Sequence, residues 1–158
     1  MSEQAIDIAH PPQALLKAIN PVLRLALRTP LGPALNQFMV VNFTGRKTGR
    51  RFSVPVSAHH LDGDLYVILE AGWKHNFRDG APAVVLHNGR TTPMLGELIT
   101  DPATVADIVH RVAENYGAKK AQQTMGLKFR DSTVPPKDEF QSAATRLGIA
   151  AIRLTPAP

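Results

Sequence analysis

Alternation of apolar and polar residues predicts most of the elements in the middle of the chain. In a strand every second side chain lies on the same face, so a period of two marks a half-buried strand. The pattern is cleanest over residues 51–59, where Phe52, Val54, Val56 and Ala58 share one face. The predicted strands cover residues 37–43, 51–61, 65–69, 83–87, 90–99 and 149–154.

Two short polar segments between these strands are typical of hairpin turns. Asp62-Gly63-Asp64 joins the strands at 51–61 and 65–69, and Asn88-Gly89 joins those at 83–87 and 90–99. Asn-Gly is a strong hairpin signal because a type I′ turn needs positive φ at both central residues. The sequence therefore predicts consecutive antiparallel strands in this region.

One long helix is clearly marked after the last of these hairpins. Asp101 is a good N-cap, Pro102 suits the first helical position, and Gly117 follows the end. Apolar residues between these limits recur with the helical period, which indicates one buried face. A shorter helix is predicted over residues 136–147, whereas the polar stretch 118–135 has no clear pattern.

The N-terminal part has a different character. Residues 1–12 look like a loose leader, and short helices are predicted near 13–19 and 21–28. Lys17, Arg24 and Arg28 line the flank of their apolar face. Two interpretations stay open: an amphipathic helix packed on the core, or an interfacial helix in peripheral contact with anionic lipid.

These elements predict one domain in a chain of 158 residues. The expected fold class is mainly β (α+β), with six antiparallel strands, an N-terminal helical segment and a crossover helix. We divide the chain into a leader with amphipathic helices, 1–36, and a β-domain, 37–158. A small barrel is the natural closure because it removes exposed sheet edges.

Composition narrows the chemistry. The chain has no cysteine, which excludes disulfides and thiol nucleophiles and fits a reducing cytoplasm, the expected location. No apolar run is long enough to span a bilayer, and the first ten residues lack the basic region of a secretory signal. Residues 1–60 hold seven basic groups against two acids, so the net charge of +5 is concentrated there.

Four of these cations lie in the turn Thr44-Gly-Arg-Lys-Thr-Gly-Arg-Arg51. The two glycines allow consecutive N–H groups to converge on an anion, and Arg46, Lys47, Arg50 and Arg51 add charge. A solvated basic hairpin and a phosphate site both fit the pattern. Nucleic acid is disfavoured because no aromatic residue is interleaved with the cations, so we expect no nucleic-acid partner.

A second cluster surrounds the sole tryptophan, in Trp73-Lys-His-Asn-Phe-Arg78. It fits either a tryptophan that plugs the barrel or an aromatic wall at a pocket mouth with polar anchors. His59 and His60 are adjacent in a strand and point to opposite faces, so they cannot share an ion without distortion. No metal site is expected.

Residues 35–90 resemble the deazaflavin-dependent nitroreductase family, split β-barrel oxidoreductases that use the deazaflavin cofactor F420. The matching motifs are the T-G-R-K-T-G turn, the Pro55-Val56 strand, the Asp62–Asp64 hairpin, W-x-x-N-F-R from Trp73 and the Gly89-Arg90 pair. The resemblance implies that the basic turn holds the phosphate and polyglutamate tail of F420, and that the strand ends border its ring. The implied cofactor-binding residues are Arg46, Lys47, Thr48, Gly49, Arg50, Arg51, Pro55, Val56, Leu69, Glu70, Ala71, Trp73 and Asn76.

The resemblance favours an oxidoreductase that passes a hydride from reduced F420 to a hydrophobic compound such as a quinone, an enone, a nitro compound or an unsaturated lipid-like molecule. Two alternatives stay open: an FMN-dependent reductase, and a non-catalytic barrel that binds F420 or lipid. No strong general acid stands out, and the candidates for the catalytic proton are Ser53, Ser57, His59 and Tyr116, the last as a counterpart of tyrosines that close the pocket in relatives. Homodimers are usual in this fold, so a homodimer is expected.

Overall fold

The computed structural model describes residues 5–8, 38–125 and 127–157. The predicted helices near 13–19 and 21–28, and with them the domain boundary and the membrane contact, lie outside these ranges and stay predictions. In chain order the elements are β1 (Ile6–Ile8), β2 (Phe38–Thr44), β3 (Arg51–Ser57), β4 (His59–Leu61), β5 (Asp64–Leu69), η2 (Gly72–Phe77), β6 (Ala81–His87), β7 (Arg90–Ile99), α2 (Pro102–Tyr116), α3 (Ala118–Met125), β8 (Leu127–Phe129), α4 (Lys137–Leu147) and β9 (Ala150–Pro156).

Seven strands form the main sheet, in the order β3-β2-β6-β7-β9-β5-β4, and every neighbouring pair is antiparallel. This confirms the mainly β, antiparallel prediction. The predicted count of six is wrong for the described residues. The alternating segment 51–59 divides at Ala58 into two strands, and a separate two-stranded sheet pairs β1 with β8.

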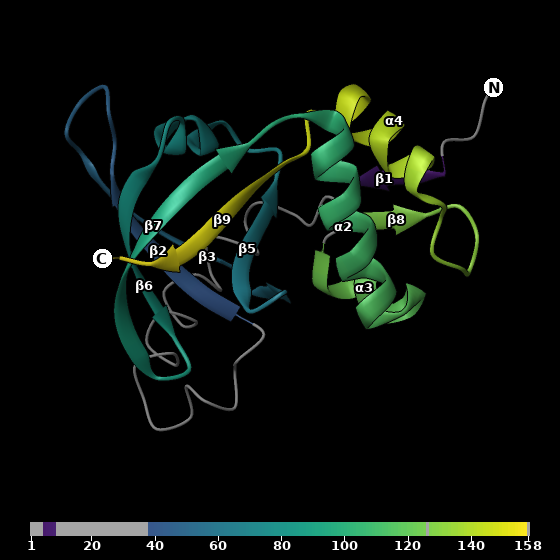
Figure 1. Cartoon of the computed structure of the whole chain (residues 1–158), viewed down its shortest axis with the longest axis horizontal. Coiled ribbons are helices and arrows are strands. Elements are labelled where there is room, and N and C mark those ends of the chain that lie inside the picture. The colour runs from purple at the N-terminus through teal and green to yellow at the C-terminus, as the bar shows by residue number, and fades with distance from the viewer. Residues whose placement is uncertain (1–4, 9–37, 126, 158) are drawn as a thin grey trace, which may run out of the picture.

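The break at Ala58 shows how the sheet curls. β3 and β4 are the two edge strands of the sheet, yet only Ala58 separates them in the chain. Opposite edges can be joined by one residue only if the sheet bends round on itself, and the result is the curled half-barrel at one end of Figure 1. The rings of His60 in β4 and His87 in β6 lie 5.5 Å apart, which fits this curvature.

The interior of the barrel is filled by one cluster of apolar side chains, among them Met39, Val41 and Ile152. The ring of Phe77, from the 3₁₀ helix η2, enters this cluster and is fully buried. Gly96 of β7 makes room for it, because a Cβ atom there would stand 2.5 Å from the Phe77 ring. Sequence alternation placed Val54 and Val56 on the inner face, and both pack against this cluster.

The helices and the β1–β8 pair form a second layer beside the barrel (Figure 1). The predicted long helix is confirmed as α2: Asp101 accepts a hydrogen bond from the Thr104 amide at its start, and Gly117 follows its end. The predicted helix over 136–147 is confirmed as α4, closed by Gly148 in the left-handed conformation. Residues 1–12, interpreted as a loose leader, contain strand β1.

Strand β9 separates the two apolar clusters. Ala151 belongs to the cluster beneath the helices, whereas Ile152 and Leu154 belong to the barrel interior. This is the alternation of a strand buried on both faces. None of the helices in the described ranges is long and apolar enough to cross a membrane.

Candidate functional site

The basic turn links β2 to β3 and is closed by its own backbone. The Gly45 amide donates to the Arg50 carbonyl at 2.7 Å, and the Gly49 amide donates to the Gly45 carbonyl at 3.0 Å. The Arg50 amide donates to the Thr48 hydroxyl at 3.3 Å, and Gly49 has a φ of 72° that favours glycine. These amides are therefore used inside the turn, so an anion here would be held mainly by side chains, not by the expected backbone nest.

The four cations of the turn differ in their surroundings. Lys47, Arg50 and Arg51 are exposed, and their side chains make no hydrogen bond or ion pair within the described ranges. The Arg46 guanidinium instead donates to the carbonyl oxygens of Arg78 and Gly80. Three cations of the turn are thus available to an anion, while the fourth already ties the turn to another segment.

That other segment is the tryptophan motif, which the structure places beside the basic turn. The predicted loop forms the 3₁₀ helix η2. Asn76 joins the two segments, because its Oδ1 accepts from the Arg46 amide at 2.9 Å and its Nδ2 donates to the Trp73 carbonyl at 2.8 Å. The spacing of W-x-x-N-F-R followed by Gly80 therefore has a structural reason, since it supplies the partners of Arg46.

Trp73 is half-buried in an aromatic cluster at this end of the barrel. Its ring stacks on Phe43 at 5.3 Å between centroids and meets Phe77 edge-on at 6.2 Å. Phe43 also stacks on the exposed Phe52 at 5.3 Å. Trp73 thus packs against the barrel interior, and its contact with a cofactor ring stays a prediction.

The implied ring-bordering residues lie on two strands. On β3, Val56 points into the barrel, so Ser53, Pro55 and Ser57 face outward. Leu69 ends β5 and packs against the barrel interior, and Glu70 and Ala71 are exposed on the way to η2. Here Lys74 donates to the Glu70 carbonyl at 2.8 Å and to the Gly148 carbonyl at 3.3 Å, which fixes this corner.

The outer face of β3 is hollowed at both ends. Beside the turn, a hollow of about 420 Å³ is lined by Arg51 and Ser53 together with Asn42, Thr44 and Val84 from β2 and β6 and by the rings of Phe43 and Phe52.

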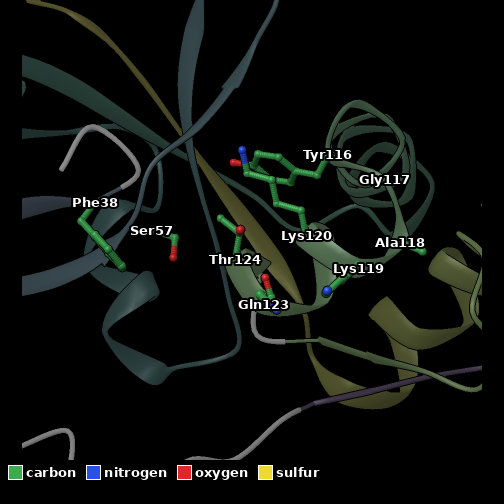
Figure 2. A pocket seen from close by; sticks show the side chains of 9 residues that line it. All are labelled: Phe38, Ser57, Tyr116, Gly117, Ala118, Lys119, Lys120, Gln123 and Thr124. Atoms are coloured by element: carbon green, nitrogen blue, oxygen red, sulfur yellow. The ribbon is translucent and has the colours of Figure 1, made fainter. Parts of the chain in front are cut away.

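At the other end of β3, a pocket of about 580 Å³ lies between the barrel and the junction of α2 and α3 (Figure 2). The barrel contributes Phe38 and Ser57, which are cross-strand partners. The helical side contributes Tyr116, Gly117, Ala118, Lys119, Lys120, Gln123 and Thr124.

Three of the four candidates for the proton lie at this pocket or directly behind it. Ser57 and Tyr116 line it, whereas Ser53 lies at the other hollow. His59 is buried behind Tyr116, with its Nδ1 2.9 Å from the tyrosine hydroxyl. Burial, with a smaller contribution from neighbouring His60, lowers the pKa of His59 to about 4, so its imidazole is neutral near pH 7. Burial also raises the pKa of Tyr116 above its usual value.

The sequence did not reveal the α3 wall of the pocket. Four of its residues belong to the stretch 118–135, for which the sequence pattern predicts no element: Lys119, Lys120, Gln123 and Thr124. A signal was present, because Ala118, Ala121 and Met125 follow the helical spacing directly after the glycine that ends α2.

No family model and no curated protein matches the chain. Among solved structures, a protein described as a domain-swapped dimer is 16% identical, with a TM-score of 0.47 over 91% of this chain and all of that one. An F420-H2 dependent reductase is 16% identical, with a TM-score of 0.46 over 75% of this chain and 94% of that one. A conserved hypothetical protein from Mycobacterium tuberculosis is 9% identical, with a TM-score of 0.46 over 99% of this chain and 87% of that one. These likenesses are too distant to carry an argument about function, and the homodimer stays a prediction.

Proposed function

We propose that the protein is a reductase that binds reduced F420 and passes a hydride to a small hydrophobic compound in the pocket between β3 and α3. F420 would supply the hydride chemistry, and the chain would bind and orient it. The observation that carries the proposal is the layout of β3, with three available cations at one end and a pocket of about 580 Å³ at the other.

The distance between these two features favours F420 over FMN. Six residue steps separate Arg51 from Ser57, which is about 20 Å along a strand. A deazaflavin ring at the pocket would place a long anionic tail at the turn, where Lys47, Arg50 and Arg51 are exposed. The phosphate of FMN, at the end of its short ribityl chain, would lie closer to the ring than this span.

The pocket is suited to a small organic molecule. Its volume is within the range of roughly 300–1,000 Å³ that is usual for ligand sites. Phe38 and the Tyr116 ring supply apolar surface, while Ser57, Gln123 and Thr124 supply hydrogen-bonding groups. This mixture fits a cyclic enone or a quinone, which has a flat carbon skeleton and carbonyl oxygens.

The test is a titration of the full chain with F420, followed by absorbance, and a parallel titration with FMN. We expect F420 to bind, and Lys47→Ala/Arg50→Ala to weaken its affinity about tenfold or more, with a larger effect at low salt. The control is Arg90→Ala/Lys128→Ala, which removes the same charge from residues outside the turn and the pocket and is expected to leave affinity unchanged.

The other interpretations are outcomes of the same experiment. Equal affinity of wild type and the turn variant would contradict the assignment of the tail to the turn. Binding of FMN in preference to F420 would favour the FMN-dependent reductase. Tight F420 binding without oxidation of reduced F420 by 2-cyclohexen-1-one or a quinone would favour a non-catalytic binding protein.

A further inference from the structure

His59 is the one fully buried polar or charged side chain in the described part of the molecule, with 2% of its surface exposed. It begins β4, immediately after the corner at Ala58 where the two sheet edges meet. Buried polar groups are costly without partners, so the contacts of this imidazole need an explanation.

The Tyr116 hydroxyl has two polar neighbours, the His59 ring and the Ala58 carbonyl. The Tyr116 hydroxyl donates to the Ala58 carbonyl at 3.4 Å. At the 2.9 Å contact the donor depends on which nitrogen of His59 carries the hydrogen. A hydroxyl has one proton, so when Tyr116 donates to Ala58 its oxygen accepts from Nδ1–H of His59. The burial that keeps the ring neutral leaves Nε2 without a proton in this arrangement.

The two bonds of the tyrosine oxygen differ in strength. The contact with His59 has a normal length, whereas 3.4 Å is long for a bond from a hydroxyl to a carbonyl, which usually spans about 2.5–3.0 Å. With the hydrogen of His59 on Nδ1, the hydroxyl proton is therefore held weakly by Ala58. Because Tyr116 lines the pocket, an oxygen atom of a bound molecule can take this proton in a shorter bond.

The charged and titratable groups around His59 and Tyr116 favour the binding of a molecule whose oxygen gains negative charge. The Nζ of Lys120 lies 5.5 Å from the centre of the Tyr116 ring, and Lys119 lines the same pocket. None of the described residues that line the pocket is a carboxylate. In the sheet, His60 follows His59 in β4, and Tyr66 of β5 is the cross-strand partner of His59.

We propose that the Tyr116 hydroxyl donates a hydrogen bond to the carbonyl oxygen of an enone or quinone in the pocket, and that His59 is the positioning residue that holds this hydroxyl through Nδ1–H. The proposal deepens the proposed function and rests on it. It adds to that function the group that contacts the reacting oxygen, Tyr116, and the residue that positions this group, His59.

For an enone, the hydride that F420 would supply adds to the β-carbon, and the π electrons of the carbon–carbon bond move to make an enolate. The enolate oxygen receives the Tyr116 hydrogen bond, and a solvent proton adds to the α-carbon to give the saturated ketone. The enone gains one hydride, which carries two electrons, and one proton, while F420 is oxidised by two electrons.

The kinetic test measures the oxidation of reduced F420 by 2-cyclohexen-1-one. We expect Tyr116→Phe to lower kcat about a hundredfold with little change in KM, since the bond strengthens only as charge develops. His59→Leu should lower kcat about tenfold, and His59→Asn, which keeps a donor near Nδ1, should stay within about threefold of wild type. Tyr66→Phe is the matched control, because it deletes a phenol oxygen from the helical core and should leave kcat unchanged.

A second measurement needs neither F420 nor a substrate. The chain has two tyrosines, so Tyr66→Phe leaves Tyr116 as the only phenol, and its ionisation can be followed by absorbance at alkaline pH. Since Nδ1–H stabilises the phenolate, adding His59→Leu should raise the pKa of Tyr116 further, and His59→Asn should restore much of the original value.

The outcomes separate the two proposals. Failure to bind F420 would overturn the proposed function, while the Tyr116 titration would still decide whether His59 donates to the hydroxyl. Normal F420 binding with wild-type kcat in Tyr116→Phe would overturn the role of the hydroxyl. Equal kcat and equal Tyr116 titration in His59→Leu and wild type would overturn the role of His59.

Discussion

Acidification should destabilise the protein through His59. In the unfolded chain its imidazole takes up a proton near pH 6.5, whereas burial lowers the pKa in the folded state to about 4. Between these values the unfolded state binds more protons, so the free energy of unfolding rises with pH. The contribution of His59 to stability is complete above pH 6.5 and is lost as the pH falls toward 4.

The size of this effect follows from the two pKa values. One pKa unit corresponds to about 1.4 kcal/mol, so a shift from 6.5 to about 4 removes about 3 kcal/mol when the pH reaches 4, and about 2 kcal/mol by pH 5. A loss of 2 kcal/mol is a large part of the stability of a typical domain, which is about 5–15 kcal/mol.

Urea unfolding at pH 8, 7, 6 and 5 measures the effect, with emission of the sole tryptophan, Trp73, as the signal. His59→Asn should lose about 2 kcal/mol less than wild type between pH 8 and pH 5, whatever its stability at pH 8, because Asn does not titrate. Tyr116→Phe should keep most of the wild-type slope, since burial is the main cause of the shift. Equal pH slopes in wild type and His59→Asn would refute the reasoning.

Two further predictions concern packing and the basic turn. Gly96→Ala should lower the free energy of unfolding by about 1–3 kcal/mol, because the new methyl group meets the Phe77 ring. The double variant with Phe77→Leu should recover part of the loss, and an unchanged urea midpoint in Gly96→Ala would contradict this prediction. Arg46→Ala should lower the thermal midpoint by a few degrees, whereas Lys47→Ala should not, because only the Arg46 side chain donates to the carbonyls of Arg78 and Gly80; equal midpoints would show that these bonds contribute nothing measurable.

Local signals in the sequence predicted those elements whose cause is local. The caps at Asp101 and Gly117 placed α2, and both hairpin turns lie where glycine follows Asp or Asn, with Asp62, Gly63, Asn88 and Gly89 all at positive φ. Strands β1 and β8 have three residues each and pair across 119 or more positions, so no periodicity could reveal them.

The candidate site was predicted less completely for the same reason. The cations of the turn and the tryptophan motif were recognised separately, but the Asn76 bond that joins them spans 30 residues. His59 and Tyr116 are 57 residues apart, and no local pattern in the sequence indicates that the two rings meet. The corner at Ala58 was hidden as well, because alternation continues through it although the chain passes from one sheet edge to the other.

The position of β9 has a consequence for synthesis on the ribosome. β9 is translated after all the other described strands, yet it lies between β7 and β5 in the sheet. Until it leaves the exit tunnel, no strand is hydrogen-bonded between β3-β2-β6-β7 and β5-β4. Both apolar clusters also lack the residues that β9 contributes. The nascent chain must therefore keep two incomplete sheets from pairing with other chains, and closure of the barrel is a late, cooperative event that follows translation of this strand.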